Sequence, residues 1–367
     1  MTSENQVLYG RLDPMLAALE ALTRCESPTE DLQACHDVVR LASDIATRVL
    51  GTPAEIREVE GRPVFWWGSA QPKIVLLAHL DTVWPKGSFS PVWEVQGDVL
   101  RGPGTFDMKA GFIQGLFALK GLDGDVALVA TTDEETGSKS SRALIASLSK
   151  GAQAVLVLEA SLDGKVKTGR KGTAMYQISV HGRAAHAGLE PEKGINATVE
   201  IAYIIKELAQ LENSEFGTTV VPTLLRSGTT TNTVPDLAVL DIDVRSFSTS
   251  ELLRIDFAVK SITSQHTDAR IEISGGLNRP PLETSSTLEL YERAEKVAQR
   301  IGMSPLGHAS VGGASDGNFA AASGAPVLDG LGAVGGGAHA SNEWVSIKTM
   351  KERSALLHAL VKDLLND

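Results

Sequence analysis

The chain has 367 residues, with 34 Lys and Arg against 45 Asp and Glu for a formal net charge of −11, and 43% of its residues are hydrophobic. This length exceeds one ordinary core and predicts two domains, or one domain interrupted by another, and the composition excludes disordered and fibrous proteins. The phosphate backbone of a nucleic acid repels so acidic a chain, so we expect no nucleic-acid partner.

The N-terminal segment predicts where the protein works. Residues 1–16 lack the basic-then-apolar pattern of a secretory signal, and no stretch approaches the roughly 18 uninterrupted apolar residues of a membrane span. We therefore expect a cytoplasmic protein with no membrane partner. The two cysteines, Cys25 and Cys35, lie in a predicted helical region and are expected to be reduced packing residues.

Helices and short apolar strands alternate over most of the chain. Apolar periodicity predicts amphipathic helices at Pro14–Cys25 and Gln33–Leu50, and continuous apolar runs predict buried strands. This alternation is typical of an α/β protein with a mostly parallel sheet and helices on both faces, whose site lies beyond the carboxyl ends of the strands. The predicted strands are Ile74–Leu80, Val126–Thr131, Ala154–Leu158 and Pro326–Leu331.

Residues 169–281 follow another pattern, strand–helix–strand–strand–helix–strand, which is the split βαβ arrangement of ferredoxin-like domains. Their strands alternate between apolar and polar residues, as expected where one sheet face meets helices and the other is free. We therefore predict that one domain, residues 1–168 and 282–367, is interrupted by an α+β insert with an edge or face able to pair with a second copy. The predicted elements are Ala174–Val180, Ile195–Leu211, Thr219–Leu225, Ala238–Arg245, Glu251–Ser264 and Arg270–Ser274.

Histidines and carboxylates follow several of the apolar runs. Singly, each has an ordinary explanation as a helix cap, a solvated turn or a hydrogen-bonding histidine. Because the strand ends of one parallel sheet lie at one edge, we expect these groups to converge there. The residues concerned are His79, Asp81, Glu134, Glu135, Glu159 and His339, with Asp107 between glycines and a predicted helix.

This set of side chains suits a pair of metal ions. Two histidines and three carboxylates, one of them bridging, match two zinc ions with bonds of about 2.0–2.2 Å. Asp81 is well placed to orient the imidazole of His79, two residues before it. Two metals roughly 3.5–4 Å apart let a bridging water lose a proton and attack a carbonyl. Because neighbouring side chains at a strand end diverge, Glu134 and Glu135 can supply one metal ligand and one general base.

Seven motifs in order carry a resemblance to a known family: AHLDTVWP, GPGTFDMKAG, TTDEETGS, VLEAS, GRAAHAG, GGASDGNFAAASGAPVLDGLG and GGGAHASNEWV. They look like the di-zinc hydrolases that include glutamate carboxypeptidase, aminoacylase, acetylornithine deacetylase and succinyl-diaminopimelate desuccinylase. The resemblance implies a zinc-binding α/β domain interrupted by a lid and dimerisation domain. Cobalt or manganese could replace the two zinc ions. The implied ligands are His79, Asp107, Glu135, Glu159 and His339, with Asp107 bridging, Asp81 holding His79 and Glu134 as general base.

The resemblance also implies how substrate is bound. His186 would reach across a dimer to polarise the scissile carbonyl; its plain alternative is a histidine that contacts only its own subunit. Arg245 and Asn232 would bind the substrate's carboxylate and nearby polar atoms, because a guanidinium grips a carboxylate with two parallel hydrogen bonds. An outward-facing surface arginine is the plain alternative for Arg245.

Two glycine-rich stretches, GGASDGNF and GAVGGGAH, predict backbone that passes close to a ligand or adopts positive φ. By the resemblance, Gly313 and either Ser315 or Asp316 lie near the substrate's carboxylate. The resemblance further indicates a cis peptide bond between Asp107 and Met108.

Together these implications predict an enzyme that cleaves an amide bond next to a free carboxylate. The first reading is a carboxypeptidase that releases a C-terminal residue such as glutamate from a peptide or N-acyl amino acid, acting as a homodimer. The second is a deacylase of aminoacylase or acetylornithine deacetylase type, because Met108 and Lys109 after the bridging Asp are common in deacylases. A third is an inactive amino-acid-binding relative, against which the intact Glu134 and ligand set argue.

Overall fold

The computed structural model describes residues 12–366 and divides into two compact units, which are treated separately. Unit 1 comprises the chain up to Gly169, Thr284–Val311 and the chain from Ser315, and unit 2 comprises Arg170–Glu283 and Gly312–Ala314. Residues 1–11, most of the N-terminal segment expected to carry no signal, lie outside the described residues.

A six-stranded sheet in the order β1-β2-β6-β3-β7-β14 forms the centre of unit 1. Strands β6, β3, β7 and β14 are parallel, whereas β2 runs antiparallel to β6 and β1 antiparallel to β2. The expected mostly parallel sheet is therefore confirmed, with an antiparallel edge that the sequence did not predict. The strands are β1 (Glu55–Val59), β2 (Arg62–Gly68), β3 (Ile74–His79), β6 (Val126–Thr131), β7 (Ala154–Val157) and β14 (Val327–Leu328).

Helices cover both faces of this sheet because its buried side chains alternate in direction. Leu128 of β6 belongs to the larger core with Phe112 of α4, whereas its neighbour Val129 belongs to a smaller core with Leu144 of α5. None of the helices in residues 12–366 is long and apolar enough to cross a bilayer. The helices are α2 (Leu12–Arg24), α3 (Leu32–Leu50), α4 (Ala110–Ala118), α5 (Arg142–Ser149), α8 (Leu288–Arg300), α9 (Asp316–Ala322) and α10 (Ile347–Leu365).

A small antiparallel sheet in the order β15-β16-β5-β4 joins distant parts of unit 1. Trp344 of β16 pairs with Arg101 of β5, so the chain around His339 lies beside the loop that leads to Asp107. Strands this short have no periodic pattern, which is why the sequence did not predict them. They are β4 (Glu94–Gln96), β5 (Val99–Arg101), β15 (Gly335–Gly336) and β16 (Trp344–Ser346); β8 (Val166–Arg170) pairs separately with β13 (His308–Val311).

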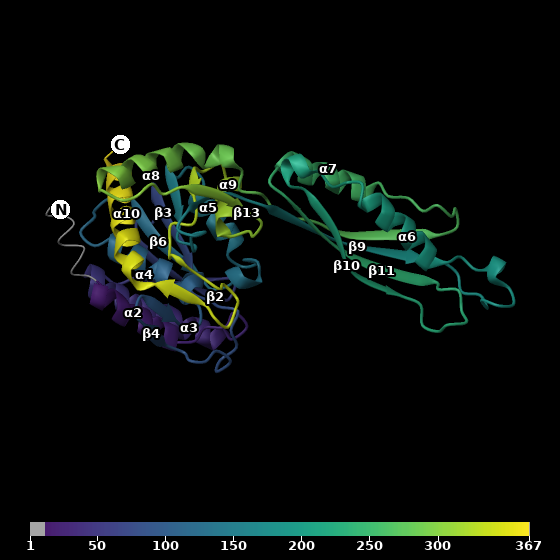
Figure 1. Cartoon of the computed structure of the whole chain (residues 1–367), viewed down its shortest axis with the longest axis horizontal. Helices are drawn as coiled ribbons and strands as arrows, with labels where there is room; N and C mark the ends of the chain where they lie inside the picture. The colour runs from purple at the N-terminus through teal and green to yellow at the C-terminus, as the bar shows by residue number, and fades with distance from the viewer. Residues whose placement is uncertain (1–11, 367) are drawn as a thin grey trace. The chain divides into compact units, whose positions relative to one another are not determined.

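Unit 2 is a four-stranded antiparallel sheet in the order β10-β11-β9-β12, with both helices on one face (Figure 1). Tyr176 and Ile178 of β9 pack into the core with Ile201 of α6 and Ile255 of α7, whereas Met175 faces away and is exposed. This is the expected split βαβ arrangement with a free sheet face. Its elements are β9 (Gly172–His181), α6 (Ala197–Leu208), β10 (Thr219–Ser227), β11 (Leu237–Ser246), α7 (Thr249–Lys260) and β12 (Arg270–Arg279).

Candidate metal centre and active site

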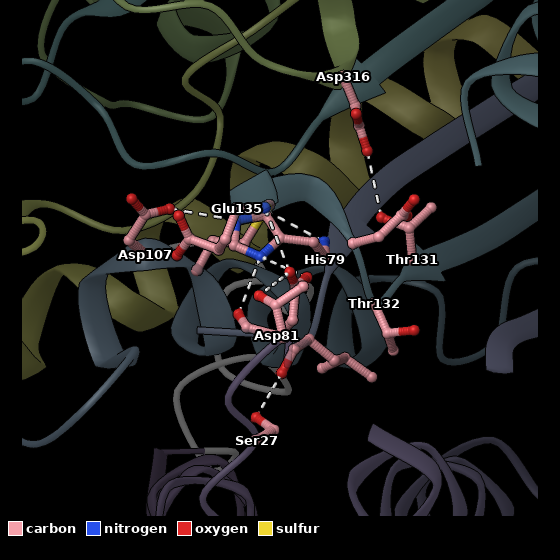
Figure 2. A network of polar contacts seen from close by, with 12 residues as sticks. Ser27, His79, Asp81, Asp107, Thr131, Thr132, Glu135 and Asp316 are labelled. Atoms are coloured by element: carbon pink, nitrogen blue, oxygen red, sulfur yellow. Dashed lines mark hydrogen bonds and ion pairs between the residues drawn. The ribbon is translucent and has the colours of Figure 1, made fainter. Parts of the chain in front are cut away.

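The side chains expected to bind metal converge beyond the carboxyl ends of the parallel strands. His79 is the last residue of β3, Glu135 lies in the short turn after β6, and Glu159 follows the end of β7. Ligand atoms of His79, Asp107 and Glu135 lie within 4.8 Å of one another. Figure 2 shows Asp107 and Glu135 beside the His79 ring, with Asp81 below it.

Asp107 faces both histidines with separate oxygens. Its Oδ1 is 3.2 Å from Nε2 of His79, and its Oδ2 is 3.3 Å from Nε2 of His339. Each histidine also has a carboxylate of its own: Glu159 Oε1 is 3.7 Å from His79 Nε2, and Glu135 Oε2 is 3.0 Å from His339 Nε2. The five residues thus form two half-sites that share one aspartate.

The charges of these side chains test whether metal ions fit. Burial lowers the pKa of His79, but hydrogen bonds to Asp107 and Asp81 outweigh it and raise that pKa well above its ordinary value. Hydrogen bonds to Asp107 and Glu135 raise the pKa of His339 to about 10. Burial raises the pKa of Glu135 to about 7. The crowded carboxylates therefore draw positive charge onto the two rings, and a pair of divalent cations would supply that charge at the same place.

Asp81 lies on the far side of the His79 ring from the shared aspartate. Nδ1 of His79 is 3.1 Å from the backbone carbonyl oxygen of Asp81 and 3.4 Å from its Oδ1. Asp81 Oδ2 accepts from the Thr29 hydroxyl at 2.7 Å and from the Glu135 N–H at 3.2 Å, and the Ser27 hydroxyl donates to the carbonyl just after His79 at 2.6 Å. Sequence reasoning missed Ser27 and Thr29; their only signal is a polar cluster between two predicted helices.

Glu134 and Glu135 both have a carboxylate oxygen near His79 but differ in their other neighbours. A carboxylate oxygen of Glu134 lies within 4.8 Å of ligand atoms of His79 and Glu159, whereas Glu135 pairs with His339. Asp133 stabilises the turn. Its Oδ2 accepts hydrogen bonds from the backbone N–H of Ser140 at 2.8 Å and of Ser141 at 3.2 Å. Adjacent glutamates thus diverge as the sequence indicated.

His186 and Asn232 lie close together in unit 2. Among residues 12–366, the hydrogen bonds of the His186 ring involve no titratable side chain. Nδ1 of His186 accepts from the N–H groups of Gly188 and Leu189 at 3.1 and 3.2 Å. The neutral ring therefore carries its proton on Nε2, and the exposed side chain can donate from there. The carbonyl of Asn232 accepts from the N–H of Ala187 at 2.9 Å.

Arg245 of β11 lies beside the glycine segment within unit 2. Its Nε and Nη2 donate to the two carboxylate oxygens of Asp243 at 2.9 and 3.2 Å, and its Nη1 donates to the carbonyl of Gly312 at 3.4 Å. Gly313 is exposed, and its carbonyl accepts from Arg170 at 3.1 Å. One edge of the Arg245 guanidinium is thus already occupied, and Nη1 points to the glycines.

Ser315 and Asp316 are both buried and hydrogen-bonded inside unit 1. The Ser315 hydroxyl donates to Asp329 Oδ2 at 2.6 Å and caps the N-terminus of α9. Asp316 accepts from the hydroxyls of Thr131 at 3.2 Å and of Ser138. Tertiary packing thus commits these two side chains to contacts within unit 1, and their predicted place near the substrate's carboxylate stays a prediction.

The second glycine-rich stretch does adopt the backbone that the sequence indicated. Gly337 has φ +77, and a Cβ on Gly335 would lie 2.0 Å from the carbonyl oxygen of Trp344, so only glycine fits there. The Asp107–Met108 peptide bond is cis, as expected.

Two further features of unit 1 adjoin the ligands and were missed from the sequence. The buried carboxylate of Glu343 accepts hydrogen bonds from the loop that carries Asp107. A cavity of about 520 Å³ is lined by residues 28–31, 82, 83, 85 and 86, and by Glu135 and Thr136. Because ligand pockets commonly measure about 300–1,000 Å³, this cavity is large enough for part of a substrate.

Comparisons with known proteins indicate the family and the fold. Residues 75–363 match the model of peptidase family M20/M25/M40. Carboxypeptidase G2 of Pseudomonas sp. (strain RS-16) is 30% identical over 81% of this chain and 75% of its own length. Succinyl-diaminopimelate desuccinylase of Methylococcus capsulatus is 27% identical over 96% of this chain and 99% of its own. The solved structure of aminopeptidase PepT from Bacillus cereus has a TM-score of 0.80 at 20% identity, over 96% of this chain and 98% of that one, which shows a shared fold.

Proposed function

The chain belongs to the M20/M25/M40 peptidase family, whose members are metal-dependent hydrolases, and we propose that it cleaves an amide bond adjacent to a free carboxylate. The observation that carries this proposal is the shared Asp107, which faces two histidines with separate oxygens. A carboxylate that faces both histidines would suit a pair of metal ions. We propose two zinc ions as the cofactor, with cobalt and manganese able to occupy the same donors.

In the proposed reaction, His79, Asp107, Glu135, Glu159 and His339 would hold the two ions. When bound, the ions supply Lewis-acid chemistry that activates water and polarises the amide carbonyl. Glu134 takes a proton from the attacking water and later delivers a proton to the departing amine. His186 donates its Nε2 proton to the carbonyl oxygen as negative charge develops there, and Arg245, with Asn232 and the Gly313 segment, binds the substrate's carboxylate.

Two substrate classes are open to this mechanism. Release of a C-terminal residue such as glutamate from a peptide or N-acyl amino acid comes first, because the relative with the higher identity is a carboxypeptidase. Removal of an acyl group from an amino acid comes second, because the desuccinylase matches nearly the whole length of both chains. A panel of dipeptides and of N-acetyl and N-succinyl amino acids, assayed by kcat/KM with added Zn²⁺, separates the two. Metal binding without turnover of any member would favour an inactive relative that only binds amino acids.

Substitution of Glu134 tests the proposed reaction. We expect Glu134→Gln to lower kcat by about 10²–10⁴-fold, because an amide cannot accept the proton from water. Both metal ions should stay bound, because the proposed ligands are unchanged. Turnover and metal content are measured on the same preparation, with Glu192→Gln at an exposed position as the control. Retained turnover would show that Glu134 is not the general base, and loss of metal would show that it is a metal ligand.

The cytoplasm is the proposed location. Both cysteines, Cys25 and Cys35, are free thiols in the structure, which suits a reducing compartment. Cell fractionation with an antibody against the chain is the direct test, and recovery outside the cytoplasmic fraction would contradict the proposal.

A further inference from the structure

Glu343 is a buried carboxylate surrounded by hydrogen-bond donors. Glu343 is 1% exposed. Oε1 accepts from the backbone N–H of Phe106 at 2.8 Å and of Asp107 at 3.0 Å, and Oε2 accepts from the N–H of Gly104 at 3.0 Å and from the indole N–H of Trp84 at 3.2 Å. An ionised carboxylate has about four acceptor positions, so these donors use them fully.

The four donors belong to chain segments that carry the proposed metal ligands. Trp84 lies in the segment that begins with His79, and the three backbone N–H groups belong to the loop that ends at Asp107. Glu343 itself lies four residues after His339, between the turn of that histidine and strand β16. One side chain therefore connects the segments of both histidines and of the shared aspartate.

Three backbone N–H groups of the loop donate to this carboxylate. Without the Glu343 side chain, this turn would leave three buried N–H donors without partners, which is unfavourable. Gly104 has φ +68, and a Cβ there would lie 2.5 Å from Cγ2 of Thr82, so the loop passes tightly against the segment after β3. Hydrogen bonds from neutral N–H groups to an ionised acceptor are about twice as strong as those between neutral groups.

We infer that Glu343 is a positioning residue that holds the segments of His79, Asp107 and His339 in one arrangement and does not bind metal itself. It belongs to neither group of side chains whose ligand atoms lie together in residues 12–366, and its oxygens are already occupied by N–H donors. The inference rests on the proposed metal centre. It goes beyond that proposal because it makes metal affinity depend on a residue that is not a ligand.

Glu343→Gln is the direct test because it keeps the size of the side chain and changes two acceptors into one acceptor and one donor. The new amide N–H would face N–H groups of Trp84 or of the loop, so the loop must move. Changes of this kind next to metal ligands typically lower metal affinity about 10–100-fold, and we expect a loss in that range for Glu343→Gln. Zinc affinity is measured by competition with a chromophoric chelator.

The matched control is Glu200→Gln in unit 2. Glu200 is 5% exposed, and its carboxylate accepts backbone N–H groups of Gln265 at 2.8 Å and His266 at 3.2 Å. It therefore loses the same kind of hydrogen bond far from the proposed ligands in the sequence and in the other unit. We expect Glu200→Gln to lower the thermal midpoint while leaving zinc affinity at the wild-type value.

A spectroscopic measurement separates positioning from general destabilisation. Cobalt at the site absorbs visible light with a spectrum that depends on ligand geometry. We expect the spectrum of cobalt-loaded Glu343→Gln to differ from that of the wild type and the spectrum of Glu200→Gln to match it. Equal zinc affinity and an unchanged cobalt spectrum in Glu343→Gln would overturn the inference. A wild-type chain that binds no metal would instead overturn the proposed function.

A second variant covers the case in which Glu343→Gln does not fold. Trp84→Phe removes the indole donor and keeps an aromatic ring beside Phe89, whose centroid lies 4.9 Å away. The loop bonds to Glu343 remain, so we expect a smaller loss of zinc affinity, about 3–10-fold, with an altered cobalt spectrum. A Trp84→Phe chain with wild-type affinity and spectrum would contradict the connection to the His79 segment.

Discussion

At the residue level, His339 shows where local sequence stops being informative. Its φ is +59, a left-handed conformation that side chains other than glycine rarely adopt and that costs about 1–3 kcal/mol. The stretch GGGAHAS predicts positive φ at glycines, which holds for Gly337, but nothing about histidine itself predicts it at 339. The ring of this histidine lies 3.3 Å from Asp107 Oδ2 and 3.0 Å from Glu135 Oε2, so the unusual backbone conformation occurs at a residue of the candidate site.

The candidate ligands could be predicted to different degrees. His79 ends a buried strand and Glu135 and Glu159 follow others, so the rule that parallel strand ends meet at one edge predicted that they lie together. Asp107 follows no strand of the main sheet, and only the resemblance indicated its role. The resemblance alone predicted that Ser315 lies near the substrate's carboxylate, and its burial depends on residues distant in the chain such as Asp329.

Arg245 offers a prediction about substrate binding. Asp243 accepts from its Nε and Nη2, and Nη1 donates to the carbonyl of Gly312 at 3.4 Å, so we expect a substrate's carboxylate to meet the Nη1 end of the guanidinium beside the glycines. We expect Arg245→Lys to raise KM about 10-fold or more with little change in kcat, because lysine lacks the planar fork and the Asp243 contact that orients it. The measurement is steady-state kinetics on the best substrate of the panel and on its C-terminal amide.

The matched control for Arg245 is Arg226→Lys on the neighbouring strand β10, where Arg226 lies 3.6 Å from Asp241. That exchange should leave KM unchanged. The amide substrate should bind equally weakly to both variants and to the wild type. A KM for Arg245→Lys that equals the wild-type value would assign Arg245 to the surface instead.

At the level of elements, helices and strands with strong hydrophobic periodicity were predicted accurately, whereas very short strands were not. Strand β6 begins and ends where the apolar run does, and α3 begins one residue before the predicted Gln33. Strand β14 is shorter than Pro326–Leu331, because only two of those residues pair with β7. The two-residue strand β15 could not be predicted because a pair of glycines carries no alternation. It pairs with β16, and β16 pairs with β5, which leads to the Asp107 loop.

The contact between α8 and α10 gives a prediction of pH dependence. Asp363 of α10 accepts from Nε of Arg293 at 2.7 Å and from Nη2 of Arg300 at 2.6 Å. Burial raises the pKa of Asp363, but these hydrogen bonds outweigh it and lower the pKa below its ordinary value of 3.8. A carboxylate with a lowered folded pKa stabilises the chain above its ordinary pKa and loses that effect as pH falls through the folded value.

We therefore expect Asp363→Asn to lower the free energy of unfolding by about 1–2 kcal/mol between pH 5 and pH 8, because one ionised acceptor is lost. Below about pH 4 the difference from the wild type should shrink, because the wild-type carboxylate becomes protonated. Urea titrations across this pH range measure both, with Glu289→Gln on the exposed side of α8 as the control. A difference that stays constant down to pH 3 would contradict the ionic origin of the contact.

At the level of the whole molecule, the insert carries an exposed sheet edge that bears on the proposed homodimer. Strand β10 is an edge of the unit 2 sheet, and its Leu224 and Leu225 are 53% and 50% exposed. An exposed apolar edge strand is a template for pairing with another chain. This supports the proposed homodimer through unit 2, which sedimentation equilibrium measures directly.

A mixed dimer decides whether His186 serves its own subunit or its partner. Chains with His186→Ala and chains with Glu134→Gln should each be nearly inactive as pure dimers. If His186 acts across the dimer, a mixed dimer pairs one intact Glu134 with the intact His186 of the other chain and restores one site. Random pairing of equal amounts should then recover roughly one quarter of the wild-type rate, since about half of the dimers are mixed and each has one working site of two.

The same mixture gives a different result if His186 acts within its own subunit. Every site then lacks either the base or the imidazole, so mixing and subunit exchange recover nothing. Exchange is verified by native mass spectrometry of differently tagged chains, so that an absence of activity in a confirmed mixed dimer contradicts the action across the dimer. Because each variant keeps the proposed metal ligands, equal metal content in all samples ties the recovered rate to Glu134 and His186 alone.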